Sequence, residues 1–416
     1  MRDIVAAIPE PSNAVARAAI VADDLTGAAD AGDSFASAGL ATTVTWSLRD
    51  VEVLLRGCDA IAIDVDSRRR CEADAAAEVT SVVSTLRSLG IATLYKKSDS
   101  LLRGHVGAEA AAALEAWHPD AIAIATLAFP DAGRITVGGR QYARELADGV
   151  PIAPVFAHAG LPTAVLELDA VRGDRLGHRM AESIARRTRV LCCDTESNED
   201  LSRIVRAGLR LEAPVVWIGS GGLARAVASA STDVRDRSPR AVPGPSRAGP
   251  VMLVCGSVSS IAREQISSAI EDDVEPIEVP LEALRSTGGE AEQRVLSRIR
   301  QRLDGGRDVV VFPSVPLASI DPSVSRALGE LLAPFAGSLG GLVVTGGDTA
   351  SAVLRGWGIT GLRIVGEIAP GAPIAVAIGS MRIVVVTKPG AFGNRDFFVE
   401  ARRKLHAMMQ EMTGTS

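Results

Sequence analysis

Aromatic side chains are scarce in this sequence of 416 residues, and neither sign of charge is in large excess. Aromatic residues make up 3% of the chain, too few for the base-stacking platforms that single-strand binding proteins use. The 44 lysine and arginine residues are outnumbered by 50 aspartate and glutamate residues, which gives a formal net charge of -6. A chain of this charge lacks the broad basic surface that attracts nucleic acids or anionic membranes. We therefore expect no nucleic-acid partner and no membrane partner.

Long apolar segments are also missing. A densely apolar stretch such as residues 121–130 is far shorter than the roughly 20 residues that a membrane-spanning helix needs. The first residues, which include Asp3 and Glu10, lack the basic start, apolar run and small-residue cleavage site of a secretory signal. These features predict a soluble, cytoplasmic protein.

Cysteine pairs and several common catalytic motifs are absent from the sequence as well. The five cysteines are an odd number, have no C-x-x-C spacing and mostly stand beside apolar runs, which favours buried thiols over disulfides or metal ligands. There is no P-loop pattern and no G-x-G-x-x-G fingerprint, which disfavours the common nucleotide-hydrolysing and dinucleotide-binding folds. The H-E-x-x-H and G-x-S-x-G motifs are missing too.

What the sequence does contain is a repeated alternation of short apolar runs and helical patterns. Runs such as residues 121–125 are continuously apolar, which indicates strands of a parallel sheet covered on both faces. Residues 72–89 predict an amphipathic helix, with Val79, Val83 and Leu86 on one face. The predicted strands are residues 19–22, 41–45, 60–64, 93–96, 121–125, 189–192, 215–218, 251–255, 308–312, 342–345, 363–365, 374–378 and 383–387.

One segment interrupts this alternation. Residues 232–250 combine prolines with mixed charges and have no periodicity, which is typical of a linker between domains. The sequence therefore predicts one domain over residues 1–231 and a second over residues 251–416, closed by a helix near residues 396–412. The expected fold class is α/β, with two doubly wound α/β/α domains, mainly parallel sheets and an interdomain cleft.

Polar residues follow several predicted strands of the first domain, where an open parallel sheet binds its ligands. Asp23 and Asp24 follow the first strand and precede a helix. One of them could simply cap that helix, but a pair could also bind sugar hydroxyls, hold Mg²⁺ or accept a proton from an attacking hydroxyl.

Two further clusters in the first domain carry cations. Residues 96–105 present Lys97, Asp99, Ser100 and Arg103 within a short span, and residues 129–136 add Gly133 and Arg134. Such a set suits a small anionic, hydroxylated ligand, because arginine grips a carboxylate with two parallel hydrogen bonds. The alternatives are a solvated charged turn and an ordinary loop.

The second domain offers glycine and hydroxyl turns in place of charges. Ser257 lies between a strand and a helix, and residues 345–350 repeat this arrangement with two glycines. A third turn, residues 388–393, follows the last strand. Because glycines at helix N-termini expose backbone N–H groups to phosphate, three such turns favour a nucleotide site over plain turns.

In this order, these motifs resemble the four-carbon acid sugar kinase family, formerly a domain family of unknown function. The resemblance implies phosphorylation by ATP, with Mg²⁺ expected, of the terminal hydroxyl of a four-carbon sugar acid such as threonate, erythronate or an oxo-tetronate. On the sugar side the matching segments are residues 22–28, residues 97–104 and the pair Gly133 and Arg134. The nucleotide side is matched by Ser257, Gly346, Gly347, Asp348, Thr349, Glu367, Lys388, Gly390 and Gly393.

Roles within this site are expectations from the sequence. Arg103, supported by Lys97 and Arg134, is expected to bind the substrate carboxylate, while Asp23 and Asp99 bind hydroxyls and Asp24 accepts the proton. The metal ligands stay open, as does the oligomeric state, for which a homo-oligomer is possible.

Residues 154–162 depart from the family by lacking its usual Asp-Pro, which leaves the identity of the sugar acid open. A binding protein without turnover, or a metal-dependent hydrolase or isomerase using the paired acids, is the alternative function.

Overall fold

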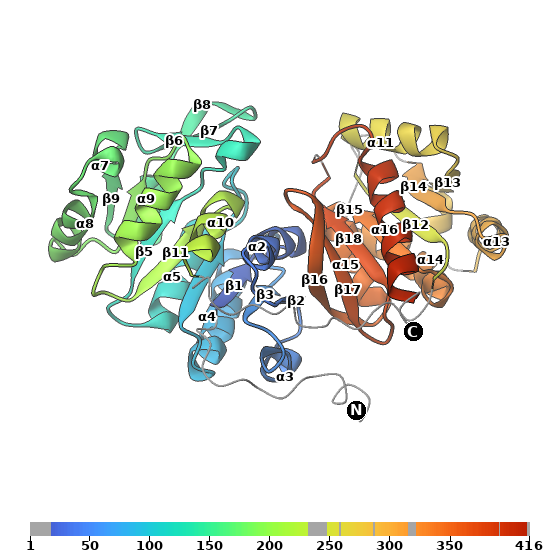
Figure 1. Cartoon of the computed structure of the whole chain (residues 1–416), viewed down its shortest axis with the longest axis horizontal. Helices are drawn as coiled ribbons and strands as arrows, with labels where there is room; N and C mark the ends of the chain where they lie inside the picture. The colour runs from blue at the N-terminus through green and yellow to red at the C-terminus, as the bar shows by residue number, and fades with distance from the viewer. Residues whose placement is uncertain are drawn as a thin grey trace. The chain divides into compact units, whose positions relative to one another are not determined.

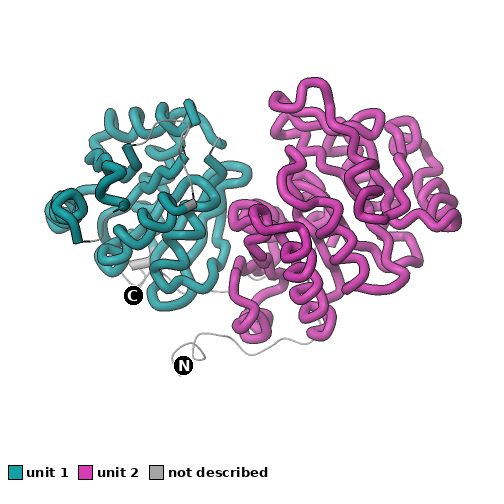
Figure 2. The backbone as a smooth tube through the Cα atoms, turned by 180° about the vertical axis from the view of Figure 1, so that it is seen from behind, with its two compact units in different colours: residues 1–8, 240–416 teal, residues 9–239 magenta. Residues whose placement is uncertain are grey.

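A computed structural model describes residues 18–231, 248–257, 259–285, 288–314, 322–390 and 392–413. These residues form two compact units, an N-terminal unit of residues 18–231 and a C-terminal unit of residues 248–413 (Figure 2, magenta and teal). Most of the predicted linker, residues 232–247, lies outside the described residues. The exact ends of the two predicted domains therefore remain predictions.

A parallel sheet forms the centre of the N-terminal unit (Figure 1). Its strands lie in the order β2-β3-β1-β4-β11-β5-β10-β9. They span Ala18–Ala22 (β1), Thr42–Thr45 (β2), Ala60–Asp64 (β3), Thr93–Lys97 (β4), Ile122–Thr126 (β5), Thr163–Leu166 (β9), Val190–Cys193 (β10) and Val215–Gly219 (β11). The register places Ala22 beside Asp64 and Lys97. The residues that follow these three strands therefore emerge at one edge of the sheet.

Helices cover both faces of this sheet. Helices α2 (Leu25–Ser37), α10 (Gly221–Ala230) and α9 (Asn198–Gly208) pack in one layer, while α4 (Glu72–Ser88) packs against α5 (Val106–Trp117). Both α2 and α4 contact β1, which explains why that strand is apolar throughout and fully buried. The predicted apolar stripe of α4 is confirmed, since Val79, Val83 and Leu86 are buried. The remaining helices are η1 (Leu48–Asp50), α3 (Val51–Leu55), η2 (Pro130–Ala132), α6 (Ala153–His158), α7 (Leu168–Arg172) and α8 (Leu176–Ala185).

The sequence did not predict a small antiparallel sheet that follows β5. It consists of β6 (Ile135–Val137), β7 (Arg140–Ala143) and β8 (Leu146–Pro151). Its strands mix buried with partly exposed positions and contain charged residues, so they lack the apolar run that identified the other strands.

The C-terminal unit has a second mainly parallel sheet, with strands in the order β13-β14-β12-β15-β18-β17-β16. They span Val251–Cys255 (β12), Glu275–Pro280 (β13), Val309–Ser314 (β14), Gly341–Thr345 (β15), Ile359–Ala369 (β16), Ala372–Gly379 (β17) and Val384–Lys388 (β18). The strand β17 runs antiparallel to both of its neighbours, and the other pairs are parallel. Cys255 pairs with Thr345, which pairs with Lys388, so the three predicted glycine turns leave one edge together.

Two helical layers cover this second sheet. Helices α11 (Ser260–Glu271) and α16 (Phe397–Thr413) pack together, and Phe397, Phe398 and Leu405 of α16 join a core with residues of β12 and β18. The predicted closing helix near residues 396–412 corresponds to α16. The other helices are α12 (Leu281–Arg285), α13 (Glu290–Asp304), α14 (Pro322–Leu332), η3 (Ala333–Ser338) and α15 (Gly347–Gly356). The predicted fold class, two α/β/α domains with mainly parallel sheets, is confirmed.

The cysteines are free thiols, as the sequence predicted. Cys58, Cys192, Cys193 and Cys255 are buried, whereas Cys71 is exposed at the start of α4. Burial raises the pKa of Cys192 well above its ordinary value, outside the range in which a thiol ionises readily. Within the ranges that the structure describes, no helix is long and apolar enough to cross a membrane.

Candidate functional site

Asp23 and Asp24 share one guanidinium group at the carboxyl edge of the N-terminal sheet. Arg68 Nε and Nη2 bind the two carboxylate oxygens of Asp23 at 2.7 and 3.0 Å, and Nη1 binds Asp24 Oδ2 at 2.7 Å. Asp24 is also the N-cap of α2, where it accepts hydrogen bonds from the backbone N–H of Gly27 and the hydroxyl of Thr26. The capping role and the charged pair are therefore both present.

Neighbouring charges stabilise the ionised forms of Asp23 and Arg68. Burial raises the pKa of Asp23, but the guanidinium of Arg68 and the ammonium groups of Lys96 and Lys97 outweigh it, so the pKa lies below its ordinary value. Although burial lowers the pKa of Arg68, Asp24 and Asp23 raise it further than burial lowers it. Asp23 and Arg68 are thus ionised at neutral pH.

Asp99 connects this cluster to the predicted carboxylate-binding arginine. Arg103 Nε and Nη2 bind the two oxygens of Asp99 at 2.7 and 2.8 Å, and Arg68 Nη2 lies 3.9 Å from Asp99 Oδ1. Despite burial, these guanidinium groups hold the pKa of Asp99 below its ordinary value. The Arg103 side chain is 61% exposed, so it can approach a ligand from the solvent side.

Ser100 and Arg134 bring the third predicted cluster to the same place. The Arg134 guanidinium donates a hydrogen bond to Ser100 Oγ, and Gln141 Nε2 donates to the Ser100 carbonyl at 3.1 Å. Gly133 adopts a left-handed conformation with φ of 68°, which lets the chain turn before Arg134. A Cβ atom on Gly133 would meet nothing within 4 Å, so space is left beside this turn.

Below these residues lies a buried ion pair. Lys96 Nζ is 2.7 Å from Glu109 Oε2, and the hydroxyl of Ser67 donates a hydrogen bond to the other oxygen of Glu109. Both charged side chains are almost completely buried. Because Ser67 directly precedes Arg68, this pair fixes the backbone that carries the central guanidinium.

In the C-terminal unit, the first two predicted turns are packed against each other. A Cβ atom on Gly256 would lie 1.8 Å from Thr349 Oγ1, so only glycine fits there without a shift of α15 or of the turn. Gly346 has φ of 95° and is the N-cap of α15, whose first residues are Gly347 and Asp348. The N-terminus of α15 is therefore lined by backbone, with Thr349 buried and Asp348 exposed.

The third turn closes this site. Ser259 caps α11 and its hydroxyl donates to the Gly390 carbonyl at 3.0 Å, while Ser257 Oγ donates to Ser259 Oγ at 3.2 Å. A Cβ atom on Gly390 would lie 2.5 Å from Ser257 Oγ. Two residues of the matching motifs, Val258 and Ala391, lie outside the described residues.

Lys388 lies under the third turn with its ammonium group buried. Its Nζ donates to the carbonyls of Pro389, Gly390 and Phe392 at 3.2, 3.4 and 2.9 Å. The centre of the Phe397 ring lies 5.4 Å from Nζ. Burial lowers the pKa of Lys388 to about 8. This geometry fits a cation that shapes the turn, whereas the prediction made Lys388 a contact of ATP.

The last two predicted nucleotide residues are more peripheral. Glu367 is exposed near the end of β16, where it pairs in register with Pro373. Since β16 runs in the same direction as β18, Glu367 lies at the same end of the sheet as the glycine turns, two strands away. Gly393 is exposed with φ of 83°, just before α16.

Comparisons with known proteins agree with this division of the chain. A model described as a sugar-binding N-terminal domain matches residues 18–227, and one described as a nucleotide-binding C-terminal domain matches residues 252–398. A D-threonate kinase of Cupriavidus necator is 34% identical over 90% of this chain and 94% of its own length. The chain belongs to the four-carbon acid sugar kinase family.

A second relative supports this membership, and a solved structure shares the fold. A D-threonate kinase of Bordetella bronchiseptica is also 34% identical, over 93% of this chain and 96% of its own length. Among solved structures, Haemophilus influenzae protein HI1011, of the family of unknown function DUF1537, has a TM-score of 0.70. It is 22% identical over 93% of this chain and 100% of its own length, and this likeness shows a common fold.

The sequence patterns did not predict Arg68 as a site residue. It contacts two of the predicted acids and lies near the third, yet the expected site residues all follow other strands. A signal was present, because residues 65–70 follow β3 and contain an aspartate, a serine and three arginines. The rule that ligands bind at the carboxyl ends of parallel strands applies to this segment equally.

The paired acids do not fit a metal site. Arg68 occupies the position between Asp23 and Asp24 that a cation would need. In the part of the chain that the structure describes, no group of three or more His, Cys, Asp or Glu side chains could hold a metal ion. The arrangement therefore favours a kinase site over the alternative of a metal-dependent hydrolase or isomerase.

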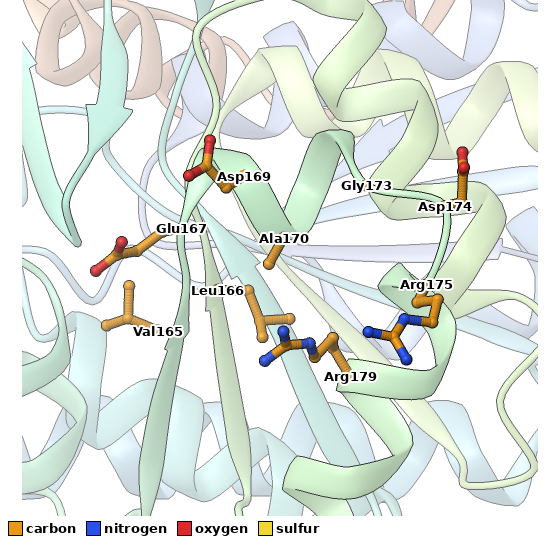
Figure 3. A pocket seen from close by; sticks show the side chains of 9 residues that line it. All are labelled: Val165, Leu166, Glu167, Asp169, Ala170, Gly173, Asp174, Arg175 and Arg179. Carbon is orange, nitrogen blue, oxygen red and sulfur yellow. The ribbon is translucent and has the colours of Figure 1, made fainter.

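A surface cavity of about 700 Å³ lies apart from these residues, beside β9, α7 and α8 (Figure 3). Glu167 and Asp169 lie on one side of it, and Arg175 and Arg179 on the other. None of its lining residues belongs to the predicted site, and its charged groups do not converge on one point (Figure 3).

Proposed function

We propose that this protein transfers the γ-phosphoryl group of ATP to the terminal hydroxyl of a four-carbon sugar acid, and that D-threonate is the first substrate to test. The observation that carries this proposal is the pairing of two chemically different sites in one chain. Carboxylates and guanidinium groups gather in one unit, and glycine turns at helix N-termini gather in the other. The names of the two relatives at 34% identity support the substrate class.

The N-terminal unit binds the sugar acid in this proposal. Asp23 and Asp99 are ionised acceptors for sugar hydroxyls, and Arg103, Arg134 and Lys97 are cations for the substrate carboxylate. Arg103 is the best candidate for the direct carboxylate contact, because it is more exposed than Arg68, whose side chain is 19% exposed. A buried anion needs such a partner to offset the loss of its hydration.

The C-terminal unit binds ATP. Backbone N–H groups at the start of α15, together with Ser257 and the turn at Gly390, can surround phosphates. The glycines of these turns have no side chains, which leaves room for the phosphates. Mg²⁺ bound to ATP uses phosphate oxygens, water and one or two carboxylates, and the exposed Asp348 at this turn is a suitable carboxylate. When bound, Mg²⁺ neutralises charge on the phosphoryl oxygens.

Which four-carbon sugar acid this protein phosphorylates is a separate question. Residues 153–158 form α6, which packs on α5, so a Cβ atom on Gly107 of α5 would lie 2.2 Å from the Val155 carbonyl. The sequence departs from the family in this segment, and α5 begins soon after the loop that carries Asp99 and Arg103. We therefore choose a panel of stereoisomers over D-threonate alone.

The test is ADP release coupled to a dehydrogenase assay, with MgATP and a panel of D- and L-threonate, D- and L-erythronate and 3-oxo-tetronates. We expect ADP release that depends on one or a few of these acids, and a phosphomonoester at the terminal carbon by ³¹P NMR. Binding of a tetronate without ADP release would instead support a sensor. Turnover without ATP would support a hydrolase or isomerase.

A further inference from the structure

Asp30 lies among the predicted sugar-acid residues without having been assigned a role. Its Oδ2 is 3.8 Å from Lys97 Nζ, and its side chain is 14% exposed. A Cβ atom on Gly221 would lie 2.6 Å from the same oxygen. Because Gly221 begins α10 directly after β11, this contact puts the Asp30 carboxylate at the carboxyl edge of the sheet, beside the other acids.

The helix geometry explains how Asp30 reaches this edge. Asp24, Gly27 and Asp30 follow one another at intervals of three residues along α2, so they lie close to one face. Lys97 extends across that face, since a Cβ atom on Gly27 would lie 3.4 Å from its Nζ and 2.5 Å from Asp24 Oδ1. The absence of a side chain at Gly27 thus lets Asp24 Oδ1 and the Lys97 ammonium group approach the helix backbone between Asp24 and Asp30.

The other carboxylates of the site are already used. Asp24 accepts hydrogen bonds from Gly27, Thr26 and Arg68, and Asp23 and Asp99 are each bound by a guanidinium through both oxygens. For Asp23 and Asp99 the guanidinium partners lower the pKa, so these two carboxylates bind a further proton poorly. Among the described residues, by contrast, the Asp30 carboxylate accepts no hydrogen bond, and its ion-pair partner is Lys97 at 3.8 Å.

We propose that Asp30 accepts the proton of the attacking sugar hydroxyl. This inference rests on the proposed function. The hydroxyl oxygen forms a bond to the γ-phosphorus, and the bond from that phosphorus to the β,γ-bridging oxygen breaks, so that ADP leaves with the electron pair. The hydroxyl proton moves to Asp30 and passes to water after product release. No further reactant is needed.

The electrostatic surroundings of Asp30 are compatible with this role. Burial raises the pKa of Asp30 and Asp24 adds to the increase, while Lys97, Arg225 and Arg134 lower the pKa by smaller amounts. The Tyr95 phenol also faces Asp30, and its own pKa lies well above the ordinary value because of burial, so it stays neutral. Asp30 therefore binds a proton more readily than Asp23 or Asp99, yet is ionised when the pH exceeds its pKa.

The decisive variant is Asp30→Asn, assayed with the acid of the panel that the unmodified protein phosphorylates. We expect kcat to fall by about 100-fold or more, the low end of what a general base contributes, while the KM values for sugar acid and MgATP change by less than about threefold. The acidic limb of the pH profile of kcat should disappear in this variant. Asp74→Asn, an exposed aspartate on α4, is the matched control and should behave as the unmodified protein.

The alternative roles have different signatures. If Asp30 only orients Lys97, Asp30→Asn raises the KM for the sugar acid and leaves kcat and its pH profile intact, which overturns the proposal. If Asp24→Asn loses the acidic limb while Asp30→Asn keeps it, the prediction from the sequence that Asp24 is the base is correct and Asp30 is not.

Two measurements keep the result interpretable. Should Asp30→Asn fail to fold by circular dichroism, Asp30→Glu keeps the carboxylate, and we expect a lower kcat with the acidic limb retained. A loss of the limb in Asp30→Glu would contradict the proposal. If the unmodified protein releases no ADP with any tetronate, the proposed function itself fails, a result distinct from normal turnover by Asp30→Asn.

Discussion

The two units place their candidate site residues at the same position in the fold but build them from different chemistry. In the N-terminal unit, charged side chains that follow β1, β3 and β4 bind one another through guanidinium groups, with Arg68 at the centre. In the C-terminal unit, the backbone of glycine turns packs against the small side chains of Ser257 and Thr349, and the Ser259 hydroxyl donates to the Gly390 carbonyl. Side-chain charges can distinguish one acid from another, whereas backbone N–H groups bind the phosphates that all nucleotides share.

The largest expected effect comes from breaking the charged cluster. Arg68→Met removes the cation that Asp23 and Asp24 share, and we expect the free energy of unfolding to fall by about 3 kcal/mol, because a buried charge loses its partner. Sugar-acid phosphorylation should be lost as well. Urea unfolding and the coupled assay measure the two effects.

The control for Arg68→Met is Arg70→Met. Arg70 pairs with Glu78 on the surface, and exposed ion pairs contribute about 0 to 1 kcal/mol. If the two variants had equal stability, the buried network around Arg68 would not be a source of stability for the N-terminal unit.

A smaller effect is expected from filling the backbone site. Gly256→Ala adds a Cβ atom 1.8 Å from Thr349 Oγ1, so the two turns must move apart. We expect the Kd for ATP to rise about tenfold, or about 1.4 kcal/mol, while the Kd for the sugar acid stays unchanged. Isothermal titration with each ligand checks this.

Gly337→Ala is the matched control in the same unit, because its Cβ atom would meet nothing within 4 Å. Unchanged ATP binding by a folded Gly256→Ala protein would mean that the nucleotide does not use these turns. A rise in the Kd for the sugar acid would mean that the charged site and the backbone site do not act separately.

The smallest effect concerns Lys388 and pH. Its pKa of about 8 lies below the ordinary lysine value of about 10.4, so the folded protein releases this proton first as the pH rises. Between these values the unfolded chain binds more protons, and this group therefore makes the folded state more stable with rising pH. The same deprotonation weakens the bonds to the turn carbonyls, and we expect the Kd for ATP to rise roughly threefold.

Opposite trends of stability and ATP affinity above pH 8 are the signature of this lysine. Urea unfolding and titration with ATP at pH 7, 8, 9 and 10 measure both, and Lys388→Met should remove both trends. If the two pH trends persist in Lys388→Met, another titrating group causes them.

The same contrast determines what could be predicted from the sequence. Strands such as β1 and β5 were recognisable because burial on both faces requires a continuous apolar run. The sheet of β6, β7 and β8 was not, because its strands alternate buried with partly exposed positions and so lack a continuous apolar run. The glycine turns were recognisable too, because glycine directly after an apolar run marks a place where the backbone turns tightly or approaches another segment.

Partner choice among charged side chains is much harder to predict. The acids Asp23, Asp24 and Asp99 stood out beside their strands, but the sequence does not record that Arg68 joins them from another strand end. That Lys388 binds ATP stays a prediction, but the sequence did not indicate that its ammonium group donates to carbonyls of its own turn. The direction of a long side chain depends on packing from segments far apart in the chain, which no local pattern encodes.

The positions of the thiols allow a dye to be attached to the N-terminal unit alone. Cys71 is the exposed cysteine, while Cys255 of the C-terminal unit is buried with its pKa raised to about 11. A maleimide dye at neutral pH would therefore attach beside the Arg68 loop and leave the nucleotide-binding unit unmarked. Fluorescence from that single position could then follow sugar-acid binding separately from ATP binding in the native chain, with no cysteine introduced or removed.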